Sequence, residues 1–561
     1  MNNKKYLVLA AFTAASVAYT FGQNMIDGVR FGSTDISGTA RYRSMAGAFG
    51  ALGGDASCMS DNPAGLAIYR GTNTFNVTPH VGFTNTENYG TVKATGKDNN
   101  FSVSNFSTIF SFMPDNDNLV NFNVGFSIER RLQTFRKMNM EFDKPGYLNA
   151  VNAGRDPGSF GGYLFEQANS YLEQSGFKAE YLGTSGAWSD NSVPLLSLMG
   201  FESYALDYAQ DDPYHVDNPI FDNVYQKSNL LERTRHDNYN LSAAVNISDV
   251  LYAGMTIRIT DFNSLVEHCF SEDSQLDMKG DYITYDNRTE TKGSGLGINL
   301  GVLWKPTEAW RLGFALHTPT WMNMKEFHDA SMEAFNINYE AMLAQNPSEQ
   351  NWSDWNDETE YDYSTPWEYQ FSTAYVFGSR AILSLEYDLR DFTTMKFHAP
   401  KFGNNDDRRY FDDMNETQKH FLQAQHTFKV GFEYRVAPRV SLRLGYAYKS
   451  SPYKDNALYT KVDLDCLERN PDCDVPSHLH PEHIAFLYRT ATKPNYTTLD
   501  DQQYFTGGIG WRGKTWTFDL ACVSHHMKEY YSPYPCDFAP SDIFDFKTHQ
   551  LNWDLSIGYR F

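Results

Sequence analysis

Histidines are the side chains of this chain that could bind a metal ion or haem, and they gather in two places. One hydrophilic segment holds His478, His480 and His483, and His525 is followed directly by His526. Imidazole nitrogens bind transition metals and haem iron, so a haem-binding receptor is a minor hypothesis. Solvated histidines in polar loops are commoner than ligands, however, and Pro481 interrupts any helix that would align the first three. We therefore predict no bound metal and no cofactor.

Catalytic motifs cannot be assembled from the sequence. No Gly-x-Ser-x-Gly elbow occurs, and no Ser, His and Asp set follows from the spacing. Gly47, Gly50 and Gly53 have a spacing that could cradle a phosphate, but no strand precedes them and no lysine follows. We therefore predict that the protein is not an enzyme.

The balance of charge excludes one class of partner. The chain of 561 residues holds 69 Asp and Glu against 47 Lys and Arg, which gives a formal net charge of -22. This charge disfavours nucleic acid as a partner. Six cysteines are too few for a disulfide-built scaffold, although Cys466 and Cys473 lie close enough in sequence to bridge within one segment.

The last stretch, Leu551 to Phe561, alternates without a fault and indicates a strand of a membrane barrel. Its apolar face has aromatic rings at both ends, which suits a strand that crosses a bilayer, and the other face suits water. The terminal Phe561 is also the residue that we expect the barrel assembly machinery to read. The apolar face holds Leu551, Trp553, Leu555, Ile557, Tyr559 and Phe561.

Alternating segments extend back to Asn73 and come in pairs joined by short turns. With the closing strand they number about fourteen, an even number as in bacterial barrels. Short turns at one rim and long loops at the other are the asymmetry of an outer-membrane barrel. Four indoles flank the short turns and predict a periplasmic girdle: Trp304, Trp310, Trp511 and Trp516.

The N-terminus is typical of a Sec-type export signal. Lys4 and Lys5 precede an apolar run from Tyr6 to Tyr19, and we place cleavage after residue 22. Residues 23–72 are then rich in small residues and turn signals, which favours a compact plug rather than a strand. Residues 73–561 form the barrel, so we expect an all-β, antiparallel transmembrane protein in the outer membrane of a Gram-negative bacterium.

The longest connection, between Gln133 and Asn238, is too long for a plain loop. A helical period over Gly161 to Gln174 predicts a helix there. A strongly apolar run follows, and we favour a small core over a surface that captures a hydrophobic ligand. The candidates for capture are Leu195, Leu196, Leu198, Met199 and Phe201.

Two stretches of the N-terminal region carry a resemblance to a known family. Gly38 to Asp55 and Asn62 to Ala67, followed by paired strands, resemble the long-chain fatty acid transporter family of outer-membrane proteins, the FadL/TodX group. The phrase His317 to Thr320 is similar too, and the resemblance is nearest to the Bacteroidota branch. The long loops are not covered by it.

The resemblance implies a fourteen-stranded barrel closed by an N-terminal hatch. In that family, loops capture hydrophobic molecules, which leave sideways through a gap made by a kink in the third strand. On this chain the hatch motif is Asn62, Pro63 and Ala64, and Gly125 is the candidate for the kink. The apolar side chains available to shape a pocket are Met45, Phe49, Leu52, Met59, Leu66 and Ile68.

Two hypotheses of function remain. The first is passive transport of hydrophobic or amphipathic small molecules, long-chain fatty acids among them. The second is a barrel of the same family reused for surface attachment or as the shuttle of a secretion machine, which acidic, Tyr-rich loops such as Trp352 to Tyr363 would suit. In either case we expect a monomer that contacts outer-membrane lipid, lipopolysaccharide and the barrel assembly machinery.

Overall fold

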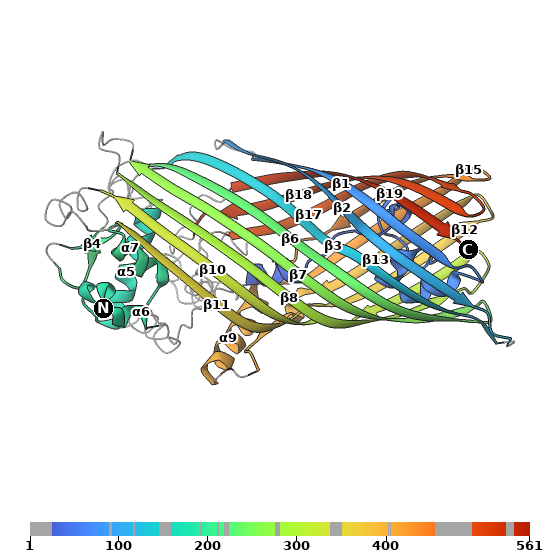
Figure 1. The fold of residues 1–561 in the computed structure, drawn as a ribbon, viewed down its shortest axis with the longest axis horizontal. Coiled ribbons are helices and arrows are strands. Elements are labelled where there is room, and N and C mark those ends of the chain that lie inside the picture. Colours follow the sequence, from blue (N-terminus) through green and yellow to red (C-terminus); the bar gives the residue numbers. More distant parts are fainter. Residues whose placement is uncertain are drawn as a thin grey trace, which may run out of the picture.

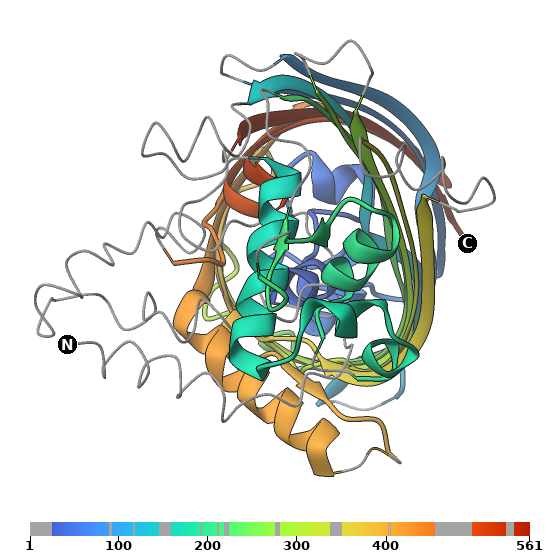
Figure 2. The same ribbon diagram turned by 90° about the vertical axis from the view of Figure 1, so that its left-hand side faces the viewer.

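Strands account for most of the structure, a computed structural model in which they curl into a barrel around the N-terminal segment (Figures 1 and 2). A group of helices lies over one end. The model describes residues 25–561 except 89–92, 116–117, 145–158, 191–192, 210–211, 218–223, 275–280, 337–350, 402, 404, 455–495 and 535–543. The predicted export signal, the three clustered histidines, Cys466 and Cys473 lie outside the described residues.

The wall is an antiparallel sheet of seventeen segments, and it closes because β1 pairs with both β2 and β19. These segments make fourteen strands around the barrel, since β9 continues into β10, β11 into β12 and β13 into β14. The predicted fourteen-stranded barrel is therefore confirmed. The segments are β1 (Thr74–Asn88), β2 (Lys93–Phe112), β3 (Leu119–Lys144), β6 (Val224–Ile247), β7 (Leu251–Ser274), β8 (Tyr282–Trp304), β9 (Trp310–His317), β10 (Trp321–Phe335), β11 (Trp352–Ser364), β12 (Trp367–Phe377), β13 (Ala381–Asp391), β14 (Lys396–His398), β15 (Ala424–Ala437), β16 (Val440–Lys449), β17 (Tyr496–Arg512), β18 (Trp516–Ser532) and β19 (Phe544–Arg560).

Three neighbouring strands break at the same level of the wall. Pro319 lies between β9 and β10, Pro366 lies between β11 and β12, and the short helix η4 (Phe392–Thr394) separates β13 from β14. Proline has no N–H to donate, so a ladder stops where it falls. Register joins these positions, because Glu368 of β12 is opposite His317 at the end of β9.

The polarity of the wall inverts along the strands. Near the middle of the closing stretch, Leu555 faces outward with 41% of its surface exposed, whereas Ser556 is buried toward the lumen. At the other end of β19, Phe544 and Phe546 are buried inside and Asp545 between them is exposed. An apolar exterior suits lipid and a charged exterior suits water. The barrel therefore has a lipid-facing band and an extension that stands clear of the membrane.

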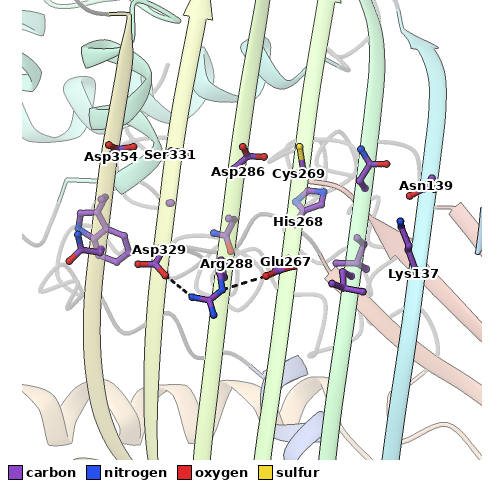
Figure 3. A pocket seen from close by; sticks show the side chains of 17 residues that line it. Lys137, Asn139, Glu267, His268, Cys269, Asp286, Arg288, Asp329, Ser331 and Asp354 are labelled. Carbon is purple, nitrogen blue, oxygen red and sulfur yellow. Dashed lines mark hydrogen bonds and ion pairs between the residues drawn. The ribbon is translucent and has the colours of Figure 1, made fainter. Parts of the chain in front are cut away.

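The outer face of the extension carries a charged band (Figure 3). Arg288 of β8 lies between Glu267 of β7 and Asp329 of β10, with N to O distances of 3.4 and 3.3 Å. A shallow groove of about 600 Å³ runs along these strands. Such a surface is incompatible with lipid. Among the described residues, none of the helices is long and apolar enough to cross a membrane.

A helical cap covers the end of the extension (Figure 2). Its α5 begins where the Ser159 hydroxyl accepts a hydrogen bond from the N–H of Gly162 at 3.0 Å, and it ends at Gly176 with a φ of 71°. Phe160 packs on Phe270 of the wall, with ring centroids 5.1 Å apart. The cap consists of α5 (Phe160–Ser175), η3 (Ala179–Gly183), α6 (Ser185–Trp188), α7 (Leu195–Glu202), β4 (Asp207–Tyr208) and β5 (Val216–Asp217).

A last helix, α9 (Asn405–Phe421), packs against β14. The side chain of Asn415 bonds both backbone groups of Phe397, accepting from the N–H at 2.9 Å and donating to the carbonyl at 2.7 Å. The amide fixes the helix to the strand end.

The strands are longer than the alternation predicted. β3 continues to Lys144 and β6 begins at Val224, so the connection predicted between Gln133 and Asn238 is shorter than expected. The acidic stretch that was expected to be a loop is strand β11. Both errors have one cause, because in the extension the outward side chains are hydrophilic. The helix predicted from Gly161 to Gln174 is present as α5.

A charge on the outside should be costly only inside the lipid-facing band. We expect Leu555→Arg, in the middle of that band, to lower the free energy of unfolding by about 2 to 4 kcal/mol. Asp545→Arg, on the same strand but in the extension, should change it by less than about 0.5 kcal/mol. Urea unfolding of the barrel refolded into lipid vesicles measures both free energies. Equal losses would contradict the assignment of Leu555 to the lipid-facing band and of Asp545 to the extension.

Candidate functional site: a gap in the wall beside the N-terminal segment

The N-terminal segment, residues 25–72, lies inside the barrel and is almost entirely buried (Figure 2). Small residues let it fold tightly. A Cβ placed on Gly53, whose φ is +61°, would lie 2.7 Å from the Cα of Gly65, so here backbone packs directly on backbone. Its elements are α2 (Met25–Gly32), α3 (Ala40–Arg43), η1 (Ala56–Met59) and η2 (Pro63–Ile68).

Asn62, the first residue of the predicted hatch motif, ties this segment to the wall. Its side-chain oxygen accepts a hydrogen bond from the N–H of Ala64 at 3.1 Å, which caps η2, and Pro63 occupies the first turn. Its amide nitrogen donates to the carbonyls of Gly50 at 2.7 Å and of Val302 in β8 at 3.2 Å. One buried side chain thus holds the turn, the preceding loop and the barrel together.

The wall makes room for this motif with glycine. A Cβ on Gly254 of β7 would lie 2.4 Å from the carbonyl carbon of Pro63, and one on Gly301 of β8 would lie 2.1 Å from Oδ1 of Asn62. Distances this short leave no space for any side chain at either position. The motif therefore packs directly on the wall backbone at these two glycines.

The six apolar side chains that were predicted to shape a pocket instead form the core of the N-terminal segment. Met45, Phe49 and Leu52 pack with wall residues such as Tyr504, while Met59, Leu66 and the partly buried Ile68 pack with wall residues such as Leu303. None of them lines the cavities described below. The expected pocket of these residues is therefore filled by their own packing.

The ladder between β2 and β3 is interrupted. Asn105–Phe112 pair with Phe122–Glu129, and Lys93–Thr95 pair with Asn139–Glu141, but no pairs join residues 96–104 to residues 130–138. Both stretches remain strands, because β2 still pairs with β1 there and β3 still pairs with β6. The wall consequently has a gap between two otherwise continuous strands.

Two bulges mark the end of the gap that adjoins the pair Asn105 and Glu129. β2 shifts register against β1 so that Ser104 is an extra residue, opposite Pro79, and β3 shifts register against β6 so that Arg131 is an extra residue. A bulge bends its strand and ends regular pairing, and Pro79 cannot donate to a ladder. Pairing between β2 and β3 therefore ends at Asn105 and Glu129.

The N-terminal segment holds both edges of this gap. The backbone N–H of Asp35 donates to the carbonyl of Arg131 at 2.7 Å, and the Ser37 hydroxyl donates to the Glu129 carboxylate at 3.0 Å. On the other edge, the Ser104 hydroxyl lies 3.3 Å from the carbonyl of Gly38. Residues 35–38 therefore contact β2 and β3 at the point where the two strands separate.

Two neighbouring cavities, which share several lining residues, lie beside the gap. The smaller, about 30 Å³, is polar and is lined by residues of both edges, among them Ser102, Arg130 and Gln133. The larger, about 90 Å³, shares Gln133 with it and is lined by apolar and charged side chains together. The apolar lining includes Ile26, Val29, Leu132 and Met527, and the charged lining includes Arg136 and Glu529. The space beside the gap is therefore of mixed polarity.

Gly125, the predicted kink, lies elsewhere. It pairs regularly with Ile109 of β2 and Ser242 of β6, and the register shift of β3 comes six residues later at Arg131. A Cβ on Gly125 would lie 2.6 Å from the sulfur of Met59, so this glycine accommodates the N-terminal segment. The sequence signal that points to the gap is Pro79 within an alternating stretch.

Many solved structures match this chain, and several of them cover almost all of it. A FadL homologue from Pseudomonas aeruginosa aligns with a TM-score of 0.53 and 12% identity, over 94% of this chain and 99% of that one. The deltaS2 mutant of the TodX monoaromatic hydrocarbon channel aligns with a TM-score of 0.50 and 12% identity, over 94% and 100%. The chain has the FadL fold. No family description and no curated protein matches it by sequence.

Outside the gap, the other predicted residues of this FadL-fold barrel are placed as follows. The loop candidates for capture lie in α7, where all but the partly buried Phe201 belong to the core beneath the cap. His525 faces the lumen and His526 faces outward, so the two cannot share a ligand. Within the described part of the chain, no group of three or more potential metal ligands occurs.

Removing the Asn62 side chain should destabilise the FadL-fold barrel. We expect Asn62→Ala to lower the free energy of unfolding by about 1 to 3 kcal/mol, because the carbonyl of Gly50 loses its buried partner. Asn323→Ala removes an exposed side chain that donates to Asp362 at 3.1 Å, so it should cost less than about 0.5 kcal/mol. Urea unfolding in vesicles compares them, and a wild-type value for Asn62→Ala would contradict the anchoring role.

Proposed function

We propose that the protein is an outer-membrane channel for the passive uptake of hydrophobic or amphipathic small molecules, with a sideways exit between β2 and β3. The observation that carries this proposal is the interrupted ladder beside an N-terminal segment that touches both edges. Lipid offers backbone groups no hydrogen-bond partner, so an interrupted ladder in a membrane wall needs a reason. A solute passage supplies one.

The chemistry of the larger cavity favours amphipathic solutes such as long-chain fatty acids. Its wall combines Ile26, Val29, Leu132 and Met527 with ionic groups such as Arg136, which has carboxylate partners in Glu232 and Glu529. A solute with an apolar tail and a polar end would match both kinds of lining. TodX is named a monoaromatic hydrocarbon channel. The lining of the larger cavity in this chain is more polar than such a solute alone would require.

The outer face supports the proposed location and partners. The apolar band would contact outer-membrane lipid, and the charged extension above it would lie among lipopolysaccharide sugars. Phe561 is 58% exposed at the rim, and its backbone exchanges two hydrogen bonds of 3.2 Å with Asn73. It is therefore accessible to the assembly machinery as the proposed signal, and we propose a monomer inserted after Sec-type export.

Loosening the hatch motif should impair gating. Replacing Asn62 and Pro63 by alanine, beside the existing Ala64, removes the cap and the fixed turn that seat the N-terminal segment. We expect uptake of a fluorescent long-chain fatty acid by cells to fall several-fold and single-channel recordings to show a leak of small ions. Wild-type uptake without a leak would contradict gating by this segment and favour the partner-binding alternative.

Straightening the wall should close the exit without a leak. Deleting both Ser104 and Arg131 removes the two extra residues, so β2 and β3 can pair throughout. We expect fatty acid uptake to fall at least tenfold while ion conductance stays at the wild-type level. Deleting Val436, the extra residue of the bulge near the turn between β15 and β16, is the control and should leave uptake unchanged. Undiminished uptake in the double deletion would contradict a lateral exit.

A further inference from the structure

We propose that a third cavity, buried between the N-terminal segment and the wall, binds a small anion. The cavity measures about 40 Å³ and lies beside the level at which β9, β11 and β13 are interrupted. Three arginines from three different strands face it: Arg131 of β3, Arg258 of β7 and Arg390 of β13. This site goes beyond the proposed transport function and does not depend on it.

Arg258 is the cation that most needs a negative partner. Only 9% of its surface is exposed, and among the described residues no carboxylate forms an ion pair with it. Its guanidinium donates instead to neutral oxygens, the side chain of Asn299 at 2.7 Å, Thr320 at 2.8 Å and the carbonyl of Thr318 at 3.1 Å. Its direct partners are thus neutral, and the nearby Glu368 carboxylate, which attracts it without contact, is already paired with Arg390.

The other two arginines do not remove that excess. Arg390 pairs with Glu368 at 2.6 Å, and Arg131 pairs with Glu129 at 3.0 Å. Glu368 is shared, because the ring of His317 lies 3.5 Å from the same carboxylate oxygen. Three guanidinium groups therefore line the cavity, and among the described residues Glu368 is the one carboxylate that lines it with them.

His236 provides an independent sign of a missing ligand. Its ring lines the cavity and is 5% exposed; the Asn238 side chain lies near enough to interact with it, but neither ring nitrogen has a partner with hydrogen-bond geometry. An unpaired buried imidazole costs free energy unless something in the cavity accepts its N–H. An anion held by Arg258 would be that acceptor.

The size of the cavity limits what the anion can be. A volume of about 40 Å³ is close to that of one or two water molecules, so it fits a halide ion or a single carboxylate group and not a whole solute. Gly297, directly opposite Arg258 in the ladder, leaves room for the guanidinium, since a Cβ there would lie 2.6 Å from Nη2. The anion is either a free ion or the carboxylate end of an amphipathic molecule.

Anomalous diffraction from crystals of the full chain tests this site. In bromide without fatty acid, the wild type should show a bromide peak between Arg258 and His236, and Arg258→Met should lose it. Arg288→Met is the control, since that arginine lies on the outer face of the extension with Glu267 and Asp329, and it should keep the peak. If bromide is absent but crystals grown with a long-chain fatty acid hold its carboxylate there, the anion is the solute's own and the site stands. Water alone in both crystals would overturn the proposal.

A solution measurement covers the case in which Arg258→Met does not fold. His236→Phe keeps all three arginines and removes only the donor. At constant ionic strength, bromide should raise the melting temperature of the wild type, and the concentration needed for half of that effect should rise at least fivefold in His236→Phe. Equal bromide sensitivity in both proteins would overturn the site, and fatty acid uptake by the same variants shows separately whether transport is intact.

Discussion

Backbone groups in a bilayer have no water to bond, and this constraint organises the whole barrel. It closes the sheet through the pairing of β1 with β19, and it makes any missing ladder expensive. Where β2 and β3 separate, part of the deficit is met from inside, because the carbonyl of Arg131 accepts a hydrogen bond from Asp35. At Arg131 the N-terminal segment thus supplies a hydrogen bond in place of the missing strand partner.

The N-terminal segment is attached to the barrel at several places besides the gap. Residues 35–38 hold the gap, and the same segment is seated at its far end by Asn62 against Gly254 and Gly301. Arg43 adds a third attachment through its ion pair with Asp554 of β19 at 2.5 Å. The segment is short and buried between these attachments, so the gating that we propose requires a change at one or more of them.

Much of the fold could be predicted from the sequence, because lipid imposes its pattern locally. The alternation around Leu555 gives facing and strand type without any knowledge of distant residues, and the Asn62 cap follows from side-chain chemistry within its own turn. The extension could not be predicted in the same way. Phe544 and Phe546 turn inward only because lipid ends below them, and a hydrophilic exterior such as that of β11 is then easily taken for a loop.

The candidate site was harder still, since it depends on partners remote in sequence. Whether Met59 lines a pocket or fills a core is decided by Leu303 and its neighbours, and the extra residues Ser104 and Arg131 exist only relative to the strands beside them. Pro79 was the one local sign. Glycine in the third strand suggested a kink at Gly125, but there the missing side chain serves packing against Met59.

Photo-crosslinking during uptake measures the route of the solute directly. A long-chain fatty acid with a photoreactive group at its tail end would be illuminated during uptake, and the labelled positions identified by mass spectrometry. Exit through the gap predicts labels on its two edges, at Asn100, Ser102 and Gln133, and on the exposed Phe101 beside them. Labels confined to the floor of the lumen, for example at Leu52 and Arg311, would show passage along the barrel axis and contradict the account.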